Sequence, residues 1–178
     1  MVRLPEALVT ARLHLRCPVM DDAGAIFRSY AQDPQVCRFM VWVPHASVAV
    51  TQDFIASCLA AWATGSRKAF VITELGESEP IGMLEARMQG SMVDIGYVLA
   101  AQHWGRGFMP EAIQSLTAVA LQNPEIFRVQ ASCDTENTPS QRALEKAGFG
   151  REGRMERYTV HPNISAAPRA SFMYARCR

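Results

Sequence analysis

The sequence predicts one α/β (α+β) domain over residues 1–178, built on a single mixed, mostly antiparallel sheet of about seven strands with about four helices. Three observations support this prediction. The 178 residues are 49% apolar and 20% charged, which suits one globular core. Three strand-like runs follow one another in the middle of the chain, separated only by short polar turns. Segments with helical periodicity lie on both sides of these runs.

One strand and one helix are predicted at the start of the chain. Over residues 10–16, apolar residues alternate with polar ones, which is the pattern of a half-buried strand. Asp21 and Asp22 can cap a helix whose apolar residues recur at helical spacing. The pair Asp33-Pro34 is predicted to end that helix, because proline lacks the N–H that a further turn would need.

A second helix and a three-stranded meander follow. Ser47 can cap the helix and Gly65 can end it. The inward side chains of this helix are predicted to be Val50, Phe54, Cys58 and Trp62. The strand candidates cover residues 69–73, 81–88 and 92–99, and the short turns between them predict antiparallel pairing.

The last part of the chain alternates helices and strands. The predicted elements are a helix over 110–122, a strand over 128–133, a helix over 139–146 and strands over 151–155 and 170–176. The helix over 139–146 has the clearest boundaries. Thr138 and Gln141 have the spacing of a capping box, and Gly148 suits the position just past the helix end.

The composition argues against several classes of function. A net charge of +1 gives no whole-protein attraction to nucleic acid or to a membrane surface, and no apolar run is long enough to span a bilayer. The five cysteines contain no CxxC pair, and no histidine pair has metal-ligand spacing, so no metal site is predicted. Scattered cysteines and the absence of a signal-peptide pattern predict a cytoplasmic protein.

The most informative stretch is the loop over residues 102–108, which reads Gln-His-Trp-Gly-Arg-Gly-Phe between a predicted strand and a predicted helix. Backbone N–H groups at a helix start are unpaired and lie at the positive end of the helix dipole, so a diphosphate bound there gains several hydrogen bonds. Glycines let a ligand approach the main chain closely. A GxG tripeptide also fits a tight turn, so this loop alone leaves both interpretations open.

Four motifs in order make the chain resemble the GCN5-related N-acetyltransferases (GNAT), and within them the RimJ/RimL-like branch that acetylates N-termini of ribosomal proteins. The motifs are Thr-Ala-Arg-Leu-His-Leu-Arg at 10–16, Asp-Ile-Gly-Tyr-Val-Leu at 94–99, Gln-x-x-Gly-x-Gly at 102–107, and Cys-Asp-Thr-Glu-Asn-Thr-Pro-Ser at 133–140 followed by Leu-Glu-Lys-Ala-Gly-Phe at 144–149. The resemblance covers nearly the whole chain. It implies a single acetyltransferase domain in which two neighbouring strands splay apart and hold the cofactor.

The resemblance implies acetyl-CoA as the acyl donor, with its pyrophosphate on the 102–110 loop and its pantetheine arm along the preceding strand. The implied cofactor contacts are Val98, Leu99, Gln102, Gly105, Arg106, Gly107, Phe108, Met109, Pro110 and Asn137. Arg106 could add a charged contact to a phosphate or lie in solvent. Pro110 has no N–H to offer, which predicts weaker or rearranged cofactor contacts without loss of the fold.

Direct acetyl transfer requires the amine to lose a proton and the departing thiolate to gain one. Asp94 is the first candidate for the base, because the resembled family often has an acidic residue there; Glu85 is a second candidate, and a structural hydrogen bond is the alternative role for Asp94. Much of the wider family carries a tyrosine acid where this chain has Leu144, whereas the resembled branch uses the position of Ser140. Asn137 is expected to contact the pantetheine or to hold the loop, and both Asn137 and Ser140 also suit a helix start.

The acceptor is predicted only as a class. Residues 35–54 and 158–168 would form its walls, with Phe39 and Trp42 in an apolar part. A primary amine at a protein N-terminus is the first expectation, and polyamines, aminoglycosides and amino-acid-like metabolites stay open.

Two other functions are weighed against this one. The missing tyrosine and Pro110 would suit a module that binds acyl-CoA without catalysis. A dinucleotide-dependent oxidoreductase would need a third glycine that the loop lacks. No nucleic-acid or membrane partner is predicted, and the resemblance implies a homodimer as one oligomeric state.

Overall fold

The computed structural model describes residues 4–178, and in that range it contains one eight-stranded sheet. The strands are β1 (Ala7–Val9), β2 (Leu13–Arg16), β3 (Arg67–Glu74), β4 (Gly82–Gln89), β5 (Met92–Leu99), β6 (Arg128–Asp134), β7 (Gly150–Thr159) and β8 (Arg169–Cys177). Their order across the sheet is β1-β2-β3-β4-β5-β6-β8-β7. All neighbours pair antiparallel except β5 and β6, which are parallel. The predicted mixed, mostly antiparallel sheet is therefore confirmed, with eight strands in place of about seven.

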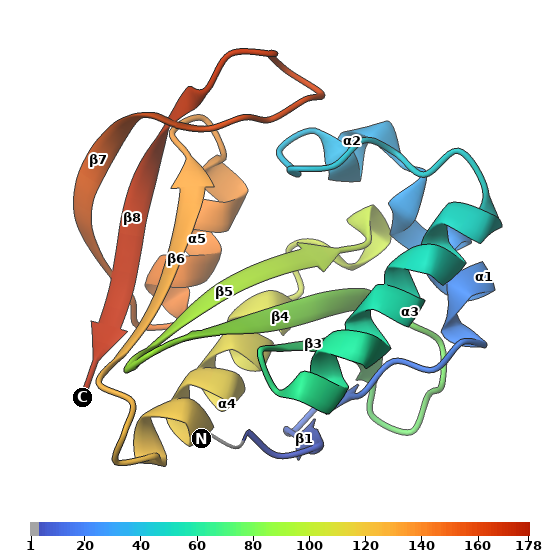
Figure 1. Ribbon diagram of the computed structural model, residues 1–178, viewed down its shortest axis with the longest axis horizontal. Coiled ribbons are helices and arrows are strands. Elements are labelled where there is room, and N and C mark those ends of the chain that lie inside the picture. The colour runs from blue at the N-terminus through green and yellow to red at the C-terminus, as the bar shows by residue number, and fades with distance from the viewer. Residues whose placement is uncertain (1–3) are drawn as a thin grey trace.

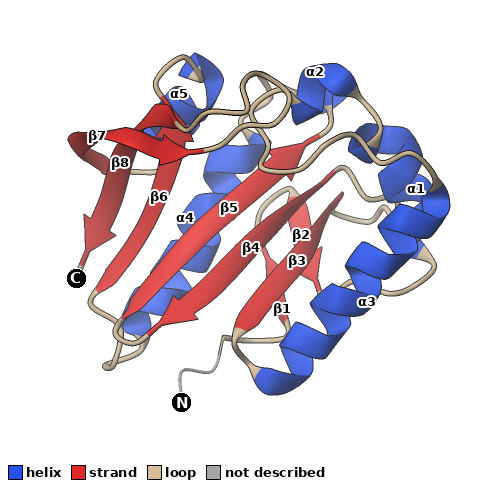
Figure 2. Cartoon of the chain, turned by 45° about the horizontal axis from the view of Figure 1, so that its top comes forward, coloured by secondary structure: helices blue, strands red, loops and turns tan. Residues whose placement is uncertain are grey.

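Helices cover both faces of this sheet. They are α1 (Asp22–Ile26), α2 (Pro34–Cys37), α3 (Val48–Thr64), α4 (Phe108–Gln122) and α5 (Thr138–Lys146), with a π-helical segment η1 (Phe27–Ala31) after α1 and a short 3-10 turn η2 (Ala101–His103) after β5. Figure 1 and Figure 2 show α1 and α3 on one face and α4 on the other. Every helix in residues 4–178 is too short or too polar to span a bilayer.

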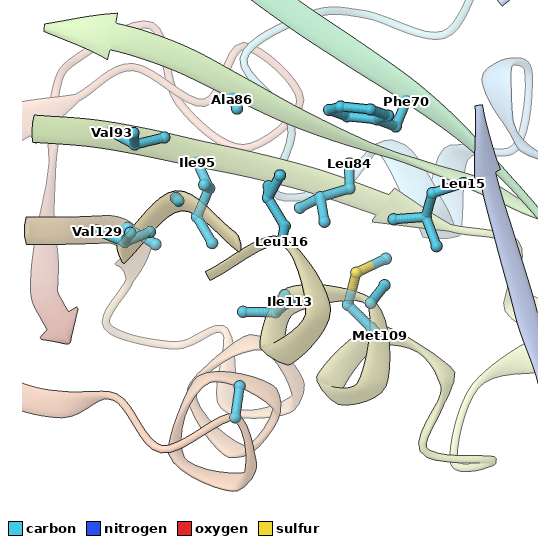
Figure 3. Packing of buried hydrophobic residues seen from close by; sticks show 14 of the residues in the cluster. Leu15, Phe70, Leu84, Ala86, Val93, Ile95, Met109, Ile113, Leu116 and Val129 are labelled. Carbon is cyan, nitrogen blue, oxygen red and sulfur yellow. The ribbon is translucent and has the colours of Figure 1, made fainter. Parts of the chain in front are cut away.

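The core on the α4 face explains why α4 forms where the sequence predicts it. Figure 3 shows Met109, Ile113 and Leu116 pointing from α4 toward Leu84 and Ile95 of the sheet. Positions 109, 113 and 116 are three or four residues apart, so they lie on one side of the helix. Burying this stripe fixes α4, and therefore the loop before it, against β4 and β5.

Strands β5 and β6 separate soon after they begin. They pair only over residues 92–94 and 128–130, although β5 continues to Leu99 and β6 to Asp134. Figure 1 shows the two strands together at one end and apart at the other. Beyond residue 94, the edge of β5 that faces β6 has no strand partner within residues 4–178, so its backbone is available to an extended ligand. The predicted splayed strand pair is confirmed.

The N-terminal region differs from the prediction in two places. The single strand expected over residues 10–16 is a hairpin, because β1 pairs with β2 and residues 10–12 form the turn. The expected caps Asp21 and Asp22 do not cap α1. Asp21 makes no capping hydrogen bond, and Asp22 instead accepts hydrogen bonds from the Arg16 guanidinium at 2.8 and 2.7 Å. Asp22 Oδ2 also accepts a hydrogen bond from the backbone N–H of Val19 at 2.8 Å, so the residues before the helix, and not its own first amides, bind this carboxylate.

Helix α3 lies where it was expected. Of its predicted inward residues, Cys58 is buried and Phe54 and Trp62 are partly buried against the cores, so only Val50 was predicted wrongly. Its fully buried residues are Thr51, Ile55 and Cys58, whereas Val50 is 42% exposed. Thr51 can be buried because its hydroxyl is hydrogen bonded to His45 Nδ1 at 2.8 Å. Since α3 has apolar residues on all sides, its hydrophobic pattern alone does not define one face.

The N-terminal cap of α5 is one residue earlier than predicted. Asn137 is the capping residue, and its Oδ1 accepts a hydrogen bond from the Ser140 N–H at 3.2 Å. Thr138 is already helical, and Gln141 Nε2 donates to the Thr135 carbonyl at 3.0 Å, so the predicted capping box is wrong. Gly148 follows the helix with a φ of 83°, as its expected position requires.

Candidate active site

A cavity of about 870 Å³ opens where β5 and β6 separate. Its walls come from β4, β5, the loop before α4, the end of β6 and the start of α5, and it extends to the segment after α2 and the loop between β7 and β8. The predicted site residues that line it are Val98, Leu99, Gly105, Gly107, Phe108, Met109, Pro110, Asn137 and Ser140. Asp94, Gln102 and Arg106 are not among the described residues that line it.

The glycine loop presents a row of unpaired amides to this cavity. The backbone N–H groups of residues 105–109 have no hydrogen-bond acceptor in the described part of the chain. Gly105 and Gly107 have φ angles of 76° and 77°, which side-chain-bearing residues rarely adopt. Pro110 is the third residue of α4, where its missing N–H breaks no helical hydrogen bond. These features fit a diphosphate bound at the start of α4.

A clamp from the N-terminal hairpin holds the loop in this conformation. The Thr10 hydroxyl donates to Glu111 Oε1 at 2.7 Å, and the Arg12 guanidinium donates to Glu111 Oε2 through Nε at 2.7 Å. Arg12 also donates to the carbonyl of Arg106 at 2.9 Å. Although partial burial opposes ionisation, these hydrogen bonds lower the pKa of Glu111. The first turn of α4 is thus tied to a segment about 100 residues away in sequence.

Replacing Glu111 by alanine is expected to loosen the loop. Loss of this partly buried ion pair removes about 1 kcal/mol, which corresponds to about a fivefold rise in the dissociation constant for acetyl-CoA. Isothermal titration calorimetry with acetyl-CoA measures the change. Glu156→Ala is the matched control, because Glu156 pairs with Arg154 on the exposed strand β7. Equal affinities of the Glu111 and Glu156 variants would show that the clamp does not shape the cofactor loop.

Two predicted cofactor contacts have side chains engaged elsewhere. Arg106 makes a bidentate ion pair with Glu74, at 2.9 and 3.1 Å, and its guanidinium stacks on the Phe108 ring. Gln102 is exposed and lies 3.2 Å from the ring of His103, measured between the two Nε2 atoms. Only the backbone of Arg106 belongs to the row of free amides, and contacts of these two side chains with a cofactor stay a prediction.

A pair of hydroxyls lies at the centre of the cavity wall. Tyr97 of β5 and Ser140 of α5 are hydrogen bonded through their side-chain oxygens at 2.7 Å. Burial raises the pKa of Tyr97 although the hydrogen bond to Ser140 lowers it, so the phenol stays protonated at neutral pH. Leu144, at the position of the family's tyrosine, is fully buried in the core. The second hydroxyl of this site therefore comes from β5, which the sequence analysis did not foresee.

Asn137 and Cys133 flank the hydroxyl pair. The Asn137 side-chain carbonyl oxygen caps α5, Asn137 lines the cavity, and its Nδ2 group has no hydrogen-bond partner in the described residues. Cys133 also lines the cavity, and burial raises the pKa of its thiol to about 11, although a hydrogen bond with Ser140 opposes the rise. The thiol is therefore neutral at pH 7 and acts as part of the wall.

Asp94 belongs to an ion-pair network on the α3 face of the sheet. Arg87 donates to Asp94 Oδ2 through Nε at 2.9 Å and to Glu85 Oε1 through Nη1 at 2.7 Å. Arg67 approaches the other Glu85 oxygen at 3.2 Å. Glu85, Arg87 and Arg67 line the cavity, whereas Asp94 does not. Asp94 is therefore connected to the cavity lining through Arg87, and its catalytic role stays a prediction.

The far end of the cavity is closed by two segments. Phe39 and Trp42, in the segment after α2, line the cavity together with Phe54 of α3. Asn163, in the loop between β7 and β8, donates through Nδ2 to the carbonyls of Cys37 and Trp42 at 2.7 and 2.8 Å. This bridge ties together two segments that both line the cavity, and the acceptor pocket expected there stays a prediction.

Comparison with known proteins agrees with this geometry. The family model described as an acetyltransferase (GNAT) domain matches residues 12–150. The chain is 32% identical over 156 residues to the uncharacterized N-acetyltransferase p20 of Bacillus licheniformis, covering 86% of this chain and 87% of that protein.

Two solved structures share the fold. One is the Salmonella typhimurium acetyltransferase described as modifying the N-terminal serine of ribosomal protein L7/L12, with a TM-score of 0.85 and 20% identity over 97% of this chain and 99% of that one. The other is RimL, the ribosomal L7/L12 alpha-N-protein acetyltransferase, in complex with coenzyme A, with a TM-score of 0.85 and 21% identity over 97% and 98% of the two chains. The family match shows that this chain is an N-acetyltransferase of the GNAT family, and the two solved structures share its fold.

Proposed function

We propose that this N-acetyltransferase moves the acetyl group of acetyl-CoA directly to a primary amine, and that the amine is a protein N-terminus. One observation carries the proposal: a single cavity joins the free amides of the glycine loop, the hydroxyl pair of Tyr97 and Ser140, and an arginine-containing pocket. Donor and acceptor can therefore meet in one space, which favours direct transfer. The activity stated for RimL, on the N-terminus of L7/L12, supports the choice of acceptor.

The donor is placed by backbone groups. The free N–H groups of residues 105–109 bind its pyrophosphate, with the dipole of α4 adding to the attraction. Its pantetheine arm lies along Val98 and Leu99, in the gap between β5 and β6. The Nδ2 group of Asn137 donates to an amide carbonyl of the same arm.

The hydroxyl pair is positioned to act on the leaving group. Tyr97 and Ser140 face the cavity, and the neutral phenol can donate to the serine while the serine donates to the thioester sulfur. Such a donor stabilises the negative charge that develops on sulfur as the C–S bond breaks. Ser140 keeps the role that the family resemblance implies for it, and Tyr97 assists it.

The charge of the acceptor pocket distinguishes between classes of amine. The charged residues that line the cavity are Arg38, Arg67, Arg87, Arg142, Lys146, Glu85 and Asp134, so cations outnumber anions. Polyamines and aminoglycosides carry several positive charges, and this excess of cations would repel them. A peptide N-terminus carries one positive charge, which it loses before reaction. The pocket therefore favours a monoamine such as a protein N-terminus.

Thiol release with matched peptides tests the proposal. Each peptide contains one lysine and occurs in two forms, with the N-terminal amine free or blocked, and mass spectrometry locates the product. We expect coenzyme A release only with the free N-terminus, and slower release with spermidine or an aminoglycoside. Faster turnover of a polycationic amine than of the free N-terminus would show that the acceptor is a polyamine or an aminoglycoside and not a protein N-terminus. A thermal shift with acetyl-CoA but no thiol release from any amine would instead indicate a non-catalytic acyl-CoA-binding module.

Asp94→Asn is expected to lower turnover more than cofactor affinity. The amide keeps the shape of the side chain but removes the charge that holds Arg87, so Arg87 and Glu85 lose their arrangement in the pocket. We expect kcat/KM for the amine to fall about tenfold, with an acetyl-CoA dissociation constant within about twofold of wild type. Asp21→Asn is the control, because Asp21 is exposed and makes no capping hydrogen bond. Unchanged turnover would remove Asp94 from the mechanism.

A further inference from the structure

The loop between β7 and β8 places a buried histidine in the cavity wall. His161 lines the cavity and is 5% exposed, yet neither ring nitrogen has a hydrogen-bond partner among the described residues. Buried polar groups in folded proteins normally have partners, so this ring is suited to bond with a molecule inside the cavity. The sequence analysis gave His161 no role, because a single histidine in an irregular segment carries no spacing signal.

The ring of His161 is held in place by its surroundings. Its edge packs against Phe39, with ring centroids 6.4 Å apart and planes at 85°. Its backbone carbonyl accepts hydrogen bonds from the N–H groups of Ile164 and Ser165, each at 2.9 Å, which closes a turn. The neighbouring Asn163 ties the same turn to the segment after α2. His161 is therefore a fixed part of the acceptor end of the cavity.

An anionic residue lies beside the ring. His161 Nε2 is 3.7 Å from Asp134 Oδ2, and the Asp134 side chain is fully buried. Arg169 donates to the same carboxylate through Nε at 2.6 Å, and Glu136 pairs in turn with Arg169. Although burial opposes ionisation, the hydrogen bond from Arg169 keeps the pKa of Asp134 below its ordinary value. Asp134 is thus an anion at neutral pH, and its Oδ2 atom lies beside Nε2 of His161.

A second unpartnered group shares this part of the wall. Ser171 of β8 is 1% exposed, lines the cavity, and its hydroxyl has no hydrogen-bond partner in the described residues. Ser171 pairs in register with Asp134 across β6 and β8, so it lies next to the carboxylate that faces His161. Two buried polar side chains from separate elements therefore offer hydrogen bonds to the same ligand.

We propose that His161 removes the proton from the acceptor amine, that Asp134 stabilises the resulting imidazolium, and that Ser171 helps to orient the amine. This inference rests on the proposed function. It assigns the base to His161 because Glu85 and Asp94 both pair with Arg87, whereas neither ring nitrogen of His161 has a hydrogen-bond partner in the described residues. The guanidinium of Arg38 stacks over Phe39, the ring against which His161 packs, with its Cζ 5.2 Å from the Phe39 centroid.

The proposed transfer moves two protons besides the acetyl group. The ammonium of the acceptor gives one proton to the imidazole, and the freed lone pair of nitrogen forms the new C–N bond with the thioester carbonyl carbon. The C–S bond breaks with its electron pair going to sulfur, which takes a proton from Ser140. The hydroxyl pair regains that proton from the amide nitrogen, directly or through water. One acetylated amine, one free thiol and one released proton result.

His161→Gln is the first test, with His14→Asn as the control because His14 lies in β2, outside the cavity. In the wild type, kcat/KM for the amine is expected to rise with pH through the ionisation of His161. The glutamine variant should lose this inflection and about 100-fold in kcat, with acetyl-CoA affinity within about twofold of wild type. His14→Asn should keep both the rate and the profile. Asp134→Asn removes the negative charge beside His161, so the inflection in kcat/KM should move to lower pH.

Chemical rescue separates a proton acceptor from a packing residue. His161→Ala should regain activity when imidazole is added, and substituted imidazoles should rescue in order of their basicity. Turnover of His161→Gln with the wild-type rate and pH profile would overturn the assignment and leave the proposed function intact. Loss of acetyl-CoA affinity in parallel with kcat, without imidazole rescue, would overturn it in favour of a structural role. A wild-type protein that binds acetyl-CoA but releases no thiol with any amine would overturn both proposals.

Discussion

Replacing Gly107 by valine is expected to raise the dissociation constant for acetyl-CoA by about 10- to 100-fold. Gly107 has a φ of 77° immediately before α4, and a β-branched residue resists this conformation. The added Cβ itself has room, since its nearest neighbour is Arg12 Nη2 at 3.5 Å. Relief of the backbone strain would turn the N–H groups of residues 107–109 away from the cavity. Isothermal titration calorimetry with acetyl-CoA measures the loss.

The control for this variant is Gly90→Val. Gly90 has a φ of 61° in the turn between β4 and β5, and a Cβ there would meet no atom within 4 Å. Gly90→Val therefore also places valine at a positive φ, but far from the cofactor loop. We expect a comparable loss of thermal stability and no change in acetyl-CoA affinity. Wild-type affinity in a folded Gly107→Val protein would show that the amides at the start of α4 do not bind the pyrophosphate.

Local sequence signals predicted the elements of this fold well. The meander of β3, β4 and β5 follows from short polar turns, and α4 follows from an apolar stripe that packs on the sheet. Errors arose where a distant residue took over a local role. Asp22 has the composition of a helix cap but binds Arg16 of β2, and α3 buries Thr51 because His45 satisfies its hydroxyl. Neither contact has a signature in the sequence pattern.

In the candidate site too, local features were predicted from the sequence and tertiary contacts were not. The glycine loop and Ser140 were predicted to lie at the site, and they line the cavity. This prediction was possible because loop conformation and motif order depend on residues that are contiguous in the sequence. The side chains around them depend on tertiary contacts. Glu111 is held by Thr10 from 101 positions away, and Tyr97 meets Ser140 across 43 positions. The direction of the Arg106 side chain could not be predicted from the sequence either, because it is set by an ion pair with Glu74 of β3.

Ser140→Ala is expected to lower kcat by about 100- to 1000-fold with little change in acetyl-CoA affinity. The start of α5 places Ser140 in the cavity wall beside Tyr97, and alanine removes the hydroxyl that we propose as the donor to the leaving sulfur. The backbone cap survives, because Asn137 Oδ1 accepts from the N–H of residue 140 and not from its side chain. Steady-state kinetics combined with acetyl-CoA titration separates this loss of chemistry from a loss of binding.

Tyr97→Phe removes only the phenol hydroxyl that is hydrogen bonded to Ser140. We expect a smaller loss of about tenfold, since the serine keeps its own proton but loses a hydrogen bond that polarises it. The double variant should be no slower than Ser140→Ala alone, as for two groups that act as one unit. Tyr158→Phe should leave kcat unchanged, because Tyr158, although within the predicted acceptor wall, is 51% exposed on β7 and does not line the cavity. Additive losses in the double variant would mean that Tyr97 and Ser140 act on different atoms, and the shared donor to sulfur would have to be abandoned.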